Sequence, residues 1–129
     1  MKHRIASLVM VSLLSCVMGC SLTKPRPNVD SLPVYPHAQV LREERPSPLE
    51  HVTYLTTMDE AKVVLDWYQQ AMLRDGWEYR PQVSSANRLV FGYNSSWSNE
   101  PAYSVGILVD ATQSGVTEIR VYWRKGLPL

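Results

Sequence analysis

Two cysteine thiols near the N-terminus are the most reactive groups that the sequence offers. Cys16 and Cys20 are its only cysteines, and both lie near the end of the N-terminal apolar run. A thiol can be acylated, can bind a metal or can form a disulfide, but no cysteine follows residue 20. We therefore expect the folded part to hold neither a disulfide nor a thiolate metal site.

Residues 1–19 have the pattern of a secretory signal peptide. Lys2, His3 and Arg4 form a positive head, and the stretch that follows is apolar or small apart from three serines and Cys16. This stretch is shorter than the about 20 apolar residues that a membrane-spanning helix needs. The pattern predicts a cleaved signal, with an ordinary signal peptide or an uncleaved anchor as alternatives to a lipoprotein signal.

Residues 17–20, Val-Met-Gly-Cys, resemble the lipobox of bacterial lipoprotein precursors. The resemblance implies that Cys20 receives a diacylglyceryl group on sulfur and that cleavage follows Gly19. It also implies a further acyl chain, such as palmitate, on the freed amine. Two or three acyl chains make a stable membrane anchor, whereas one holds a protein only reversibly. We therefore expect a lipid-anchored protein.

Residues 13–16, Leu-Leu-Ser-Cys, form a second possible lipobox. Cys20 is preferred over Cys16 because Cys20 ends the apolar run, whereas Cys16 lies inside it. In Gram-negative lipoproteins, Asp after the cysteine retains the protein at the inner membrane, and here that residue is Ser21. The resemblance therefore implies a location in the outer membrane, facing the periplasm.

Histidines are the remaining candidates for acid–base chemistry or metal binding. His37 and His51 would need to meet a carboxylate such as Glu43, Glu44 or Glu50 in a cleft. Motifs such as GxSxG, HExxH, CxxC and phosphate-binding glycine loops are missing from the sequence. We expect solvated histidines, no catalytic residues, no metal site and no cofactor.

Trp97 differs from the other large aromatic residues because its surroundings, residues 94–101, form a polar loop. An exposed tryptophan in such a loop often marks a contact surface. The alternative is that Trp97 folds back over a sheet edge. Six other aromatic side chains lie on predicted apolar faces and are expected to pack in the core: Tyr35, Tyr68, Trp77, Phe91, Tyr93 and Trp123. Trp67 borders the apolar helix face, and its position is left open.

Charge and composition narrow the class of partner. The chain has 13 Lys and Arg against 12 Asp and Glu, and Lys2 and Arg4 belong to the signal, which leaves 11 basic residues. A nearly neutral mature chain lacks the basic balance that binding to nucleic acid phosphates favours. We therefore expect no nucleic acid partner.

The chain divides into a signal, a tether and one domain. Residues 20–31 are polar, contain two prolines and show no helical or strand periodicity, which indicates a flexible tether. Residues 32–129 show neither repeats nor a second linker, and their length suits a single domain.

One amphipathic helix is predicted over residues 59–75. Thr57 and Glu60 fit a capping box at its start. Its apolar positions recur at spacings of three and four: Ala61, Val64, Leu65, Tyr68 and Met72. Gly76 suits the left-handed conformation that ends a helix, and Trp77 is placed to fold back on the last turn.

Strands are predicted on both sides of this helix, at residues 39–44, 51–57, 77–81, 88–93, 103–109 and 117–123. The prolines of residues 45–48 favour a loop between the first two, and the last two are expected to form a hairpin. The order of elements, without long crossovers between neighbouring strands, predicts an α+β fold. We expect two layers, a mainly antiparallel sheet with the helix packed on one face.

Two segments resemble a known pattern. Residues 32–38 have an LPxYPxA opening, and residues 64–77 have a YxxxLxxxGW-type helix, as in small uncharacterised bacterial lipoproteins. The resemblance implies this fold and an envelope location. Those families have no agreed activity, so it transfers no catalytic residues. His37 stands where that opening often has glycine.

Two classes of function follow. The first is a non-enzymatic envelope protein that binds a protein partner through a sheet edge, the Trp97 loop or the uncovered sheet face. The alternative is a periplasmic small-ligand-binding or hydrolytic domain, which needs a concave pocket. A one-helix sheet of this size is expected to have little volume for such a pocket, so the first class is preferred. A third possibility is a lipoprotein with a purely structural role and no specific ligand.

Overall fold

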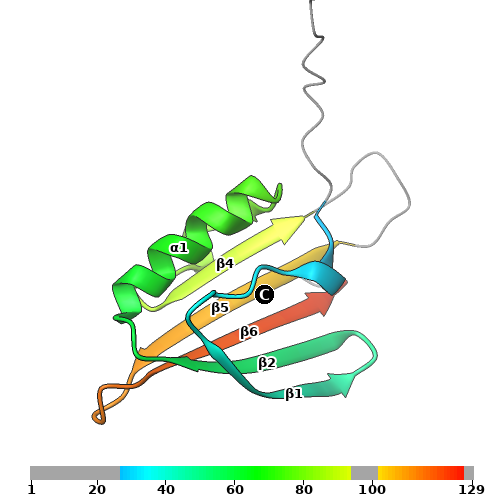
Figure 1. The fold of residues 1–129 in the computed structure, drawn as a ribbon. Helices are drawn as coiled ribbons and strands as arrows, with labels where there is room; N and C mark the ends of the chain where they lie inside the picture. Colours follow the sequence, from blue (N-terminus) through cyan, green and yellow to red (C-terminus); the bar gives the residue numbers. More distant parts are fainter. Residues whose placement is uncertain (1–26, 94–101, 127–129) are drawn as a thin grey trace, which may run out of the picture.

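The computed structural model describes residues 27–93 and 102–126 of the 129-residue chain (Figure 1). The described chain contains one α-helix, two short 3-10 helices and six strands. The 3-10 helices are η1 (Val29–Ser31) and η2 (Pro81–Val83). The other elements, in chain order, are β1 (Gln39–Ser47), β2 (Glu50–Thr57), α1 (Ala61–Arg74), β3 (Glu78–Tyr79), β4 (Arg88–Tyr93), β5 (Tyr103–Ala111) and β6 (Thr117–Lys125).

The six strands form one open antiparallel sheet in the order β1-β2-β6-β5-β4-β3. The predicted hairpin between β5 and β6 is confirmed by continuous pairing from Tyr103↔Lys125 to Ala111↔Thr117. The opening pair β1–β2 is confirmed as well. The α+β class with the helix on one face of an antiparallel sheet is therefore correct.

The start of α1 differs from the prediction. The helix begins at Ala61, and Glu60 at its N-cap makes no side-chain capping bond. Thr57 is the last residue of β2, where its hydroxyl donates to the carbonyl of His37 at 2.9 Å and accepts from the amide of Asp59 at 3.2 Å. The capping-box prediction was wrong because this hydroxyl holds the strand–helix turn.

The end of α1 follows the prediction. Gly76 adopts a φ of 94°. Its amide donates to the carbonyl of Leu73 at 3.1 Å, and the amide of Trp77 donates to Met72 at 3.1 Å. These two bonds are a Schellman motif. The motif turns the chain so that Trp77, 3% exposed, enters the core.

β1 is longer than predicted and runs through the two residues Pro46 and Ser47. It tolerates a proline because it is an edge strand, and an edge has one side without ladder bonds. Its register with β2 shifts between Val40 and Arg42 and again between Glu44 and Ser47. The predicted loop at 45–48 therefore contracts to Pro48 and Leu49. The predicted strand at 77–81 shortens to β3.

One face of the sheet carries the core. α1 packs on the part of this face formed by β3, β4 and β5, and the N-terminal segment, residues 27–38, crosses the part near β6 and β2 (Figure 1). Side chains from α1 and from the N-terminal segment pack against the side chains at alternate positions of the strands. The core that they form includes Tyr35, Tyr68, Phe91, Ile107 and Val121. Val29, in the segment predicted as tether, packs against this core.

No helix among the described residues is long and apolar enough to span a membrane.

Candidate functional site

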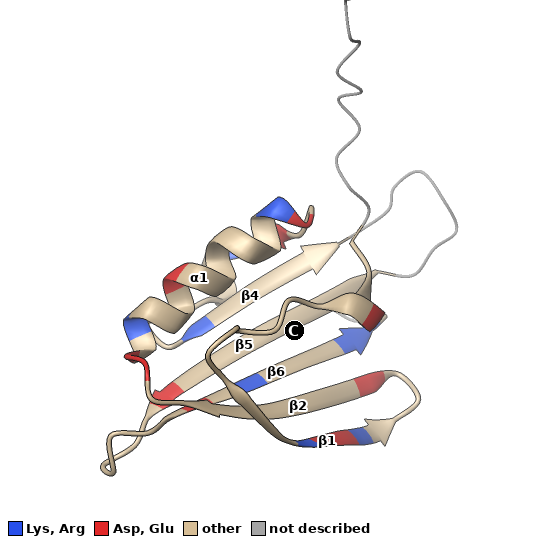
Figure 2. Ribbon diagram, in the orientation of Figure 1, with Lys and Arg blue, Asp and Glu red and all other residues tan. Residues whose placement is uncertain are grey.

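The opposite face of the sheet, which we call the bare face, carries the side chains that alternate with the core positions. Within residues 27–93 and 102–126, no helix covers it (Figure 1). One row across its strands runs Tyr54, Arg120, Leu108, Arg88. In the neighbouring row, Tyr122 lies between Val52 and Gly106. The bare face therefore mixes arginine, tyrosine and aliphatic side chains. Figure 2 marks the Lys and Arg positions of β4 and β6 in blue on the ribbon.

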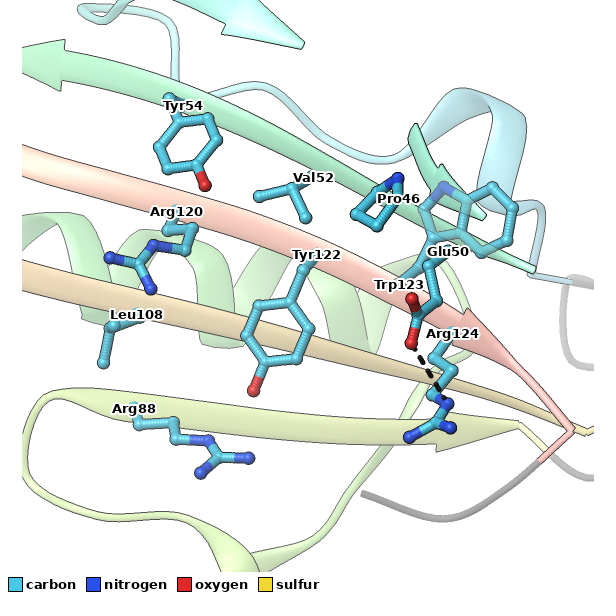
Figure 3. Close-up of a pocket in the computed structure, with 10 residues that line it drawn as sticks. All are labelled: Pro46, Glu50, Val52, Tyr54, Arg88, Leu108, Arg120, Tyr122, Trp123 and Arg124. Carbon is cyan, nitrogen blue, oxygen red and sulfur yellow. Dashed lines mark ion pairs between the residues drawn. The ribbon is translucent and has the colours of Figure 1, made fainter. Parts of the chain in front are cut away.

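These side chains line a cavity of about 470 Å³. In Figure 3, Tyr122 lies at its centre, with Arg88, Arg120 and Arg124 around it. We call this cavity the arginine groove. Its volume falls in the range of about 300–1,000 Å³ that small-ligand sites occupy. The expectation of little pocket volume was wrong, because the groove forms on the bare face of the sheet rather than between the sheet and the helix.

Tyr122 lies across the neighbouring strand because its partner there is glycine. A Cβ atom at Gly106 would lie 2.0 Å from the Cζ atom of Tyr122, far inside van der Waals contact. The ring therefore occupies the space that any other side chain at position 106 would need. Aromatic rings over cross-strand glycines shield the backbone and fix the position of the ring. The result is an aromatic floor in the middle of the groove.

The arginines of the bare face differ in their partners. Arg124 Nε lies 3.4 Å from Glu50 Oε1, and Arg42 Nε lies 3.0 Å from Glu44 Oε1. Arg88 and Arg120 form no salt bridge with any carboxylate in the described part of the chain. Their guanidinium groups lie near tyrosine rings instead.

Arg120 Cζ lies 5.6 Å from the ring centroid of Tyr54, and Arg88 Cζ lies 5.9 Å from that of Tyr122. Cation–π contacts at this distance hold a guanidinium in place but leave its N–H donors unused. Arg88 Nε is buried and has no hydrogen-bond partner among the described residues. A buried donor without a partner costs about 1–3 kcal/mol, so the position of Arg88 is not explained by hydrogen bonding of its Nε within the described residues.

A second cluster joins the N-terminal segment to the β2–α1 turn. The Tyr35 hydroxyl donates to Asp59 Oδ2, and His37 Nδ1 lies 2.8 Å from the same oxygen. The Tyr68 hydroxyl accepts from the Tyr35 amide at 3.2 Å, and Thr117 donates to the Asp59 carbonyl at 2.6 Å. Asp59 thus holds the N-terminal segment against the rest of the fold.

The electrostatics of this cluster agree with its geometry. The hydrogen bonds from Tyr35 and then from His37 hold the pKa of Asp59 below its ordinary value. The same bond to Asp59, together with burial, raises the pKa of Tyr35 to about 12. Burial raises the pKa of Tyr68 to about 12. The shifts of Asp59 and Tyr35 favour a charged carboxylate bonded to a neutral tyrosine, and the shift of Tyr68 favours the neutral hydroxyl that accepts from the Tyr35 amide. The cluster is a structural latch at neutral pH.

Neither histidine forms the cleft site that catalysis would need. The His37 side chain is 71% exposed, so its pair with Asp59 lies at the surface. His51 is 15% exposed and lines a cavity of about 160 Å³, but its Nε2 lies 3.9 Å from Glu43 Oε2, beyond hydrogen-bond distance. Neither Glu44 nor Glu50 pairs with a histidine in the parts of the chain that the structure describes.

The remaining predicted site residues lie elsewhere. Cys16, Cys20 and Trp97 fall outside the described residues. Trp67, predicted to border the helix face, packs edge-on against Tyr35 and Tyr68 at centroid distances of 5.4 and 5.0 Å. Over the described ranges, no group of three His, Cys, Asp or Glu residues is arranged to hold a metal ion.

The arginine groove was not predicted from the sequence, although β6 carries a signal for it. Arg120, Tyr122 and Arg124 alternate with core residues along this strand. A solvated strand face is typically polar and variable, whereas this one presents a tyrosine between two arginines. The residues of β6 that face away from the core form a cation–aromatic–cation pattern that is visible in the sequence. The contribution of Arg88 from β4 is not visible in that pattern.

Comparisons with protein-family models, curated proteins and solved structures find no match to this chain. The residues of the groove and the signal-like N-terminal sequence therefore carry the functional argument.

Proposed function

We propose that this protein is a lipid-anchored protein of the bacterial envelope whose domain binds a partner through the bare face and catalyses no reaction. The signal-like residues 1–19 and the lipobox-like residues 17–20 support an anchor on Cys20. Ser21 after the cysteine supports the outer membrane, with the domain facing the periplasm.

The arginine groove is the observation that carries the binding role. The groove holds Arg88 and Arg120, which form no ion pair with the described residues, and the fixed Tyr122 ring. Arginine and tyrosine are enriched in recognition sites. A guanidinium keeps its proton at physiological pH. Arg88 and Arg120 therefore suit the binding of an anion better than general acid–base chemistry.

The volume of the groove also fits the second candidate, a periplasmic domain that binds a small ligand. The distinction between the two candidates is the size of the occupant. A protein partner would contact the bare face beyond the groove, whereas a small ligand would contact only the groove.

The anchor is tested by intact mass and membrane fractionation of the protein expressed from its own signal. We expect the wild type and a Cys16→Ser variant to gain the mass of the lipid and to enter the membrane, and a Cys20→Ser variant to do neither. Loss of lipid in Cys16→Ser but not in Cys20→Ser would move the anchor to Cys16. If every variant stays soluble at the same processed mass, the lipoprotein proposal is wrong.

The binding face is tested by photo-crosslinking in intact cells. A photoreactive amino acid replaces Thr56, on the bare face beside the groove, or Leu73, which is exposed on α1. We expect protein adducts from position 56 and few from position 73. Equal adducts from both positions, or none from position 56, would contradict a partner on the bare face.

A further inference from the structure

The spacing of the groove residues along β6 matches the repeat of an extended peptide. Arg120, Tyr122 and Arg124 are alternate residues on the bare face. Same-face side chains of a strand repeat about every 6.8 Å, twice the rise of about 3.4 Å per residue. A second extended chain lying along β6 would therefore place every other side chain opposite one of these three.

The chemistry of the three positions specifies what those side chains should be. Arginine forks match carboxylates in a two-bond geometry that lysine cannot form. Arg120 has no acidic partner in the described chain. Arg124 contacts Glu50 through Nε alone in the described pair, and its remaining N–H groups can donate to a second carboxylate. Between them, Tyr122 offers a ring to an apolar side chain.

Arg88 adds a third cation from the far side of Tyr122 (Figure 3). Its Nε is buried without a hydrogen-bond partner among the described residues, and the aliphatic side chains that line the groove include Leu108 and Val52. A carboxylate of the bound chain would pair with this guanidinium, the third cation of the groove. The groove thus has cations at its margins, the Tyr122 ring and aliphatic side chains between them, and one carboxylate, Glu50, that is paired with Arg124.

From these observations we propose that the arginine groove binds an acidic segment of a partner protein in extended conformation, with an apolar side chain on Tyr122 between two carboxylates. The proposal depends on the proposed function, because it names the chemistry of the partner of the bare face. The bound motif has five residues, acid–x–apolar–x–acid, and they lie along residues 120–124 of β6.

Charge complementarity favours such a segment over a flat anionic surface. Asp110 and Glu118 are paired across β5 and β6 at the end of the bare face beyond Arg120. An anionic membrane would meet these two carboxylates together with the arginines, and like charges repel. A segment confined to residues 120–124 meets the cations and avoids Asp110 and Glu118.

The test uses the full chain in neutral detergent micelles and three fluorescently labelled peptides with blocked ends. Their cores are Glu-Ser-Leu-Ser-Glu, the uncharged Gln-Ser-Leu-Ser-Gln, and Ser-Glu-Glu-Ser-Leu, which has the composition of the first but a different spacing. Fluorescence anisotropy measures the dissociation constants. We expect the first peptide to bind at least about tenfold more tightly than the other two, because each lost charge-assisted bond costs about 1.5 kcal/mol or more.

Variants of the protein assign the binding to the groove. We expect Arg120→Gln, Arg88→Gln and Tyr122→Ala each to weaken binding by about fivefold or more. Arg74→Gln, which removes the same charge from the exposed last turn of α1, should leave the dissociation constant unchanged. Thermal unfolding of each variant verifies that it is folded. The affinity should also fall as salt is raised from about 0.05 to 0.5 M, because salt screens exposed charges.

Several results would overturn the proposal. Equal binding of the charged and uncharged peptides would remove the carboxylate requirement, and equal binding of the respaced peptide would remove the extended register. An Arg74→Gln effect as large as that of Arg120→Gln would make the attraction non-specific.

Two other occupants are distinguished in parallel. Binding of the Cys20→Ser protein to phosphatidylglycerol vesicles that requires Arg120, without peptide binding, would assign the groove to a membrane surface. Dimers in analytical ultracentrifugation that Arg120→Gln dissociates would assign it to a second copy of the chain. If none of the peptides binds but protein adducts still form from position 56, the proposed function stands and only this inference is removed.

Discussion

The two faces of one sheet differ in what they do, and β6 shows the difference within a single strand. Ile119 and Val121 point into the core and are 1% and 6% exposed. Arg120 and Tyr122, their immediate neighbours, point to the bare face and line the arginine groove. Because successive side chains of a strand point to opposite faces, one segment contributes to stability through one face and to the proposed recognition through the other. Substitutions should therefore separate the two properties residue by residue.

The largest expected effect tests the core side of this comparison. Phe91, on β4, is fully buried among the core residues. Phe91→Ala should lower the free energy of unfolding by about 3–5 kcal/mol, through lost apolar burial and the cavity left behind. Its counterpart on the bare face, Arg120→Gln, should change that free energy by no more than about 0.5 kcal/mol. Urea unfolding followed by tryptophan fluorescence measures both.

If Arg120→Gln destabilises the protein as much as Phe91→Ala, the bare face is part of the stabilising structure and the separation of the two faces fails.

An intermediate effect is expected where the bare face has its own packing. Gly106→Ala places a methyl group against the Tyr122 ring, so it should cost about 1–3 kcal/mol by overpacking and should displace the ring. Adding Tyr122→Ala to this variant should recover part of the loss, since the clash then disappears. Denaturant unfolding of the two single variants and the double variant gives the coupling. Additive losses would mean that the ring does not lie over Gly106 in solution.

The smallest expected effect concerns the latch that holds the N-terminal segment over the core face. Because the pKa of Asp59 is lower in the folded protein, the unfolded chain binds more protons in the window between the two pKa values. The stabilisation is therefore present above the ordinary value of 3.8 and is lost as the pH falls through the folded value.

We expect Asp59→Asn to flatten the acid side of the plot of unfolding free energy against pH, while the stability of an Asp66→Asn variant keeps the pH dependence of the wild type. Asp66 is exposed on α1 and makes no salt bridge in the described chain. An unchanged slope in Asp59→Asn would show that the latch does not contribute to stability.

Local patterns predicted most of the secondary structure because they reflect local geometry. The four-residue spacing of Val64, Tyr68 and Met72 defined the buried face of α1. The Schellman motif at Gly76 was predictable because glycine alone adopts a positive φ without strain. The capping box failed for the opposite reason. The partner of Thr57 is the carbonyl of His37, a contact between residues far apart in sequence.

The sequence by itself determined the helix, the strand alternation, the antiparallel α+β class and the lipobox-like segment, since each depends on residues within a few positions of one another. Only the tertiary structure decided that the sheet order is β1-β2-β6-β5-β4-β3 and that Arg88 and Arg120 lie in one row. It also decided that Tyr122 lies over Gly106 and that His37 meets Asp59. These pairings depend on strand register between distant segments, and the burial of one complete face, rather than any local pattern, sets that register.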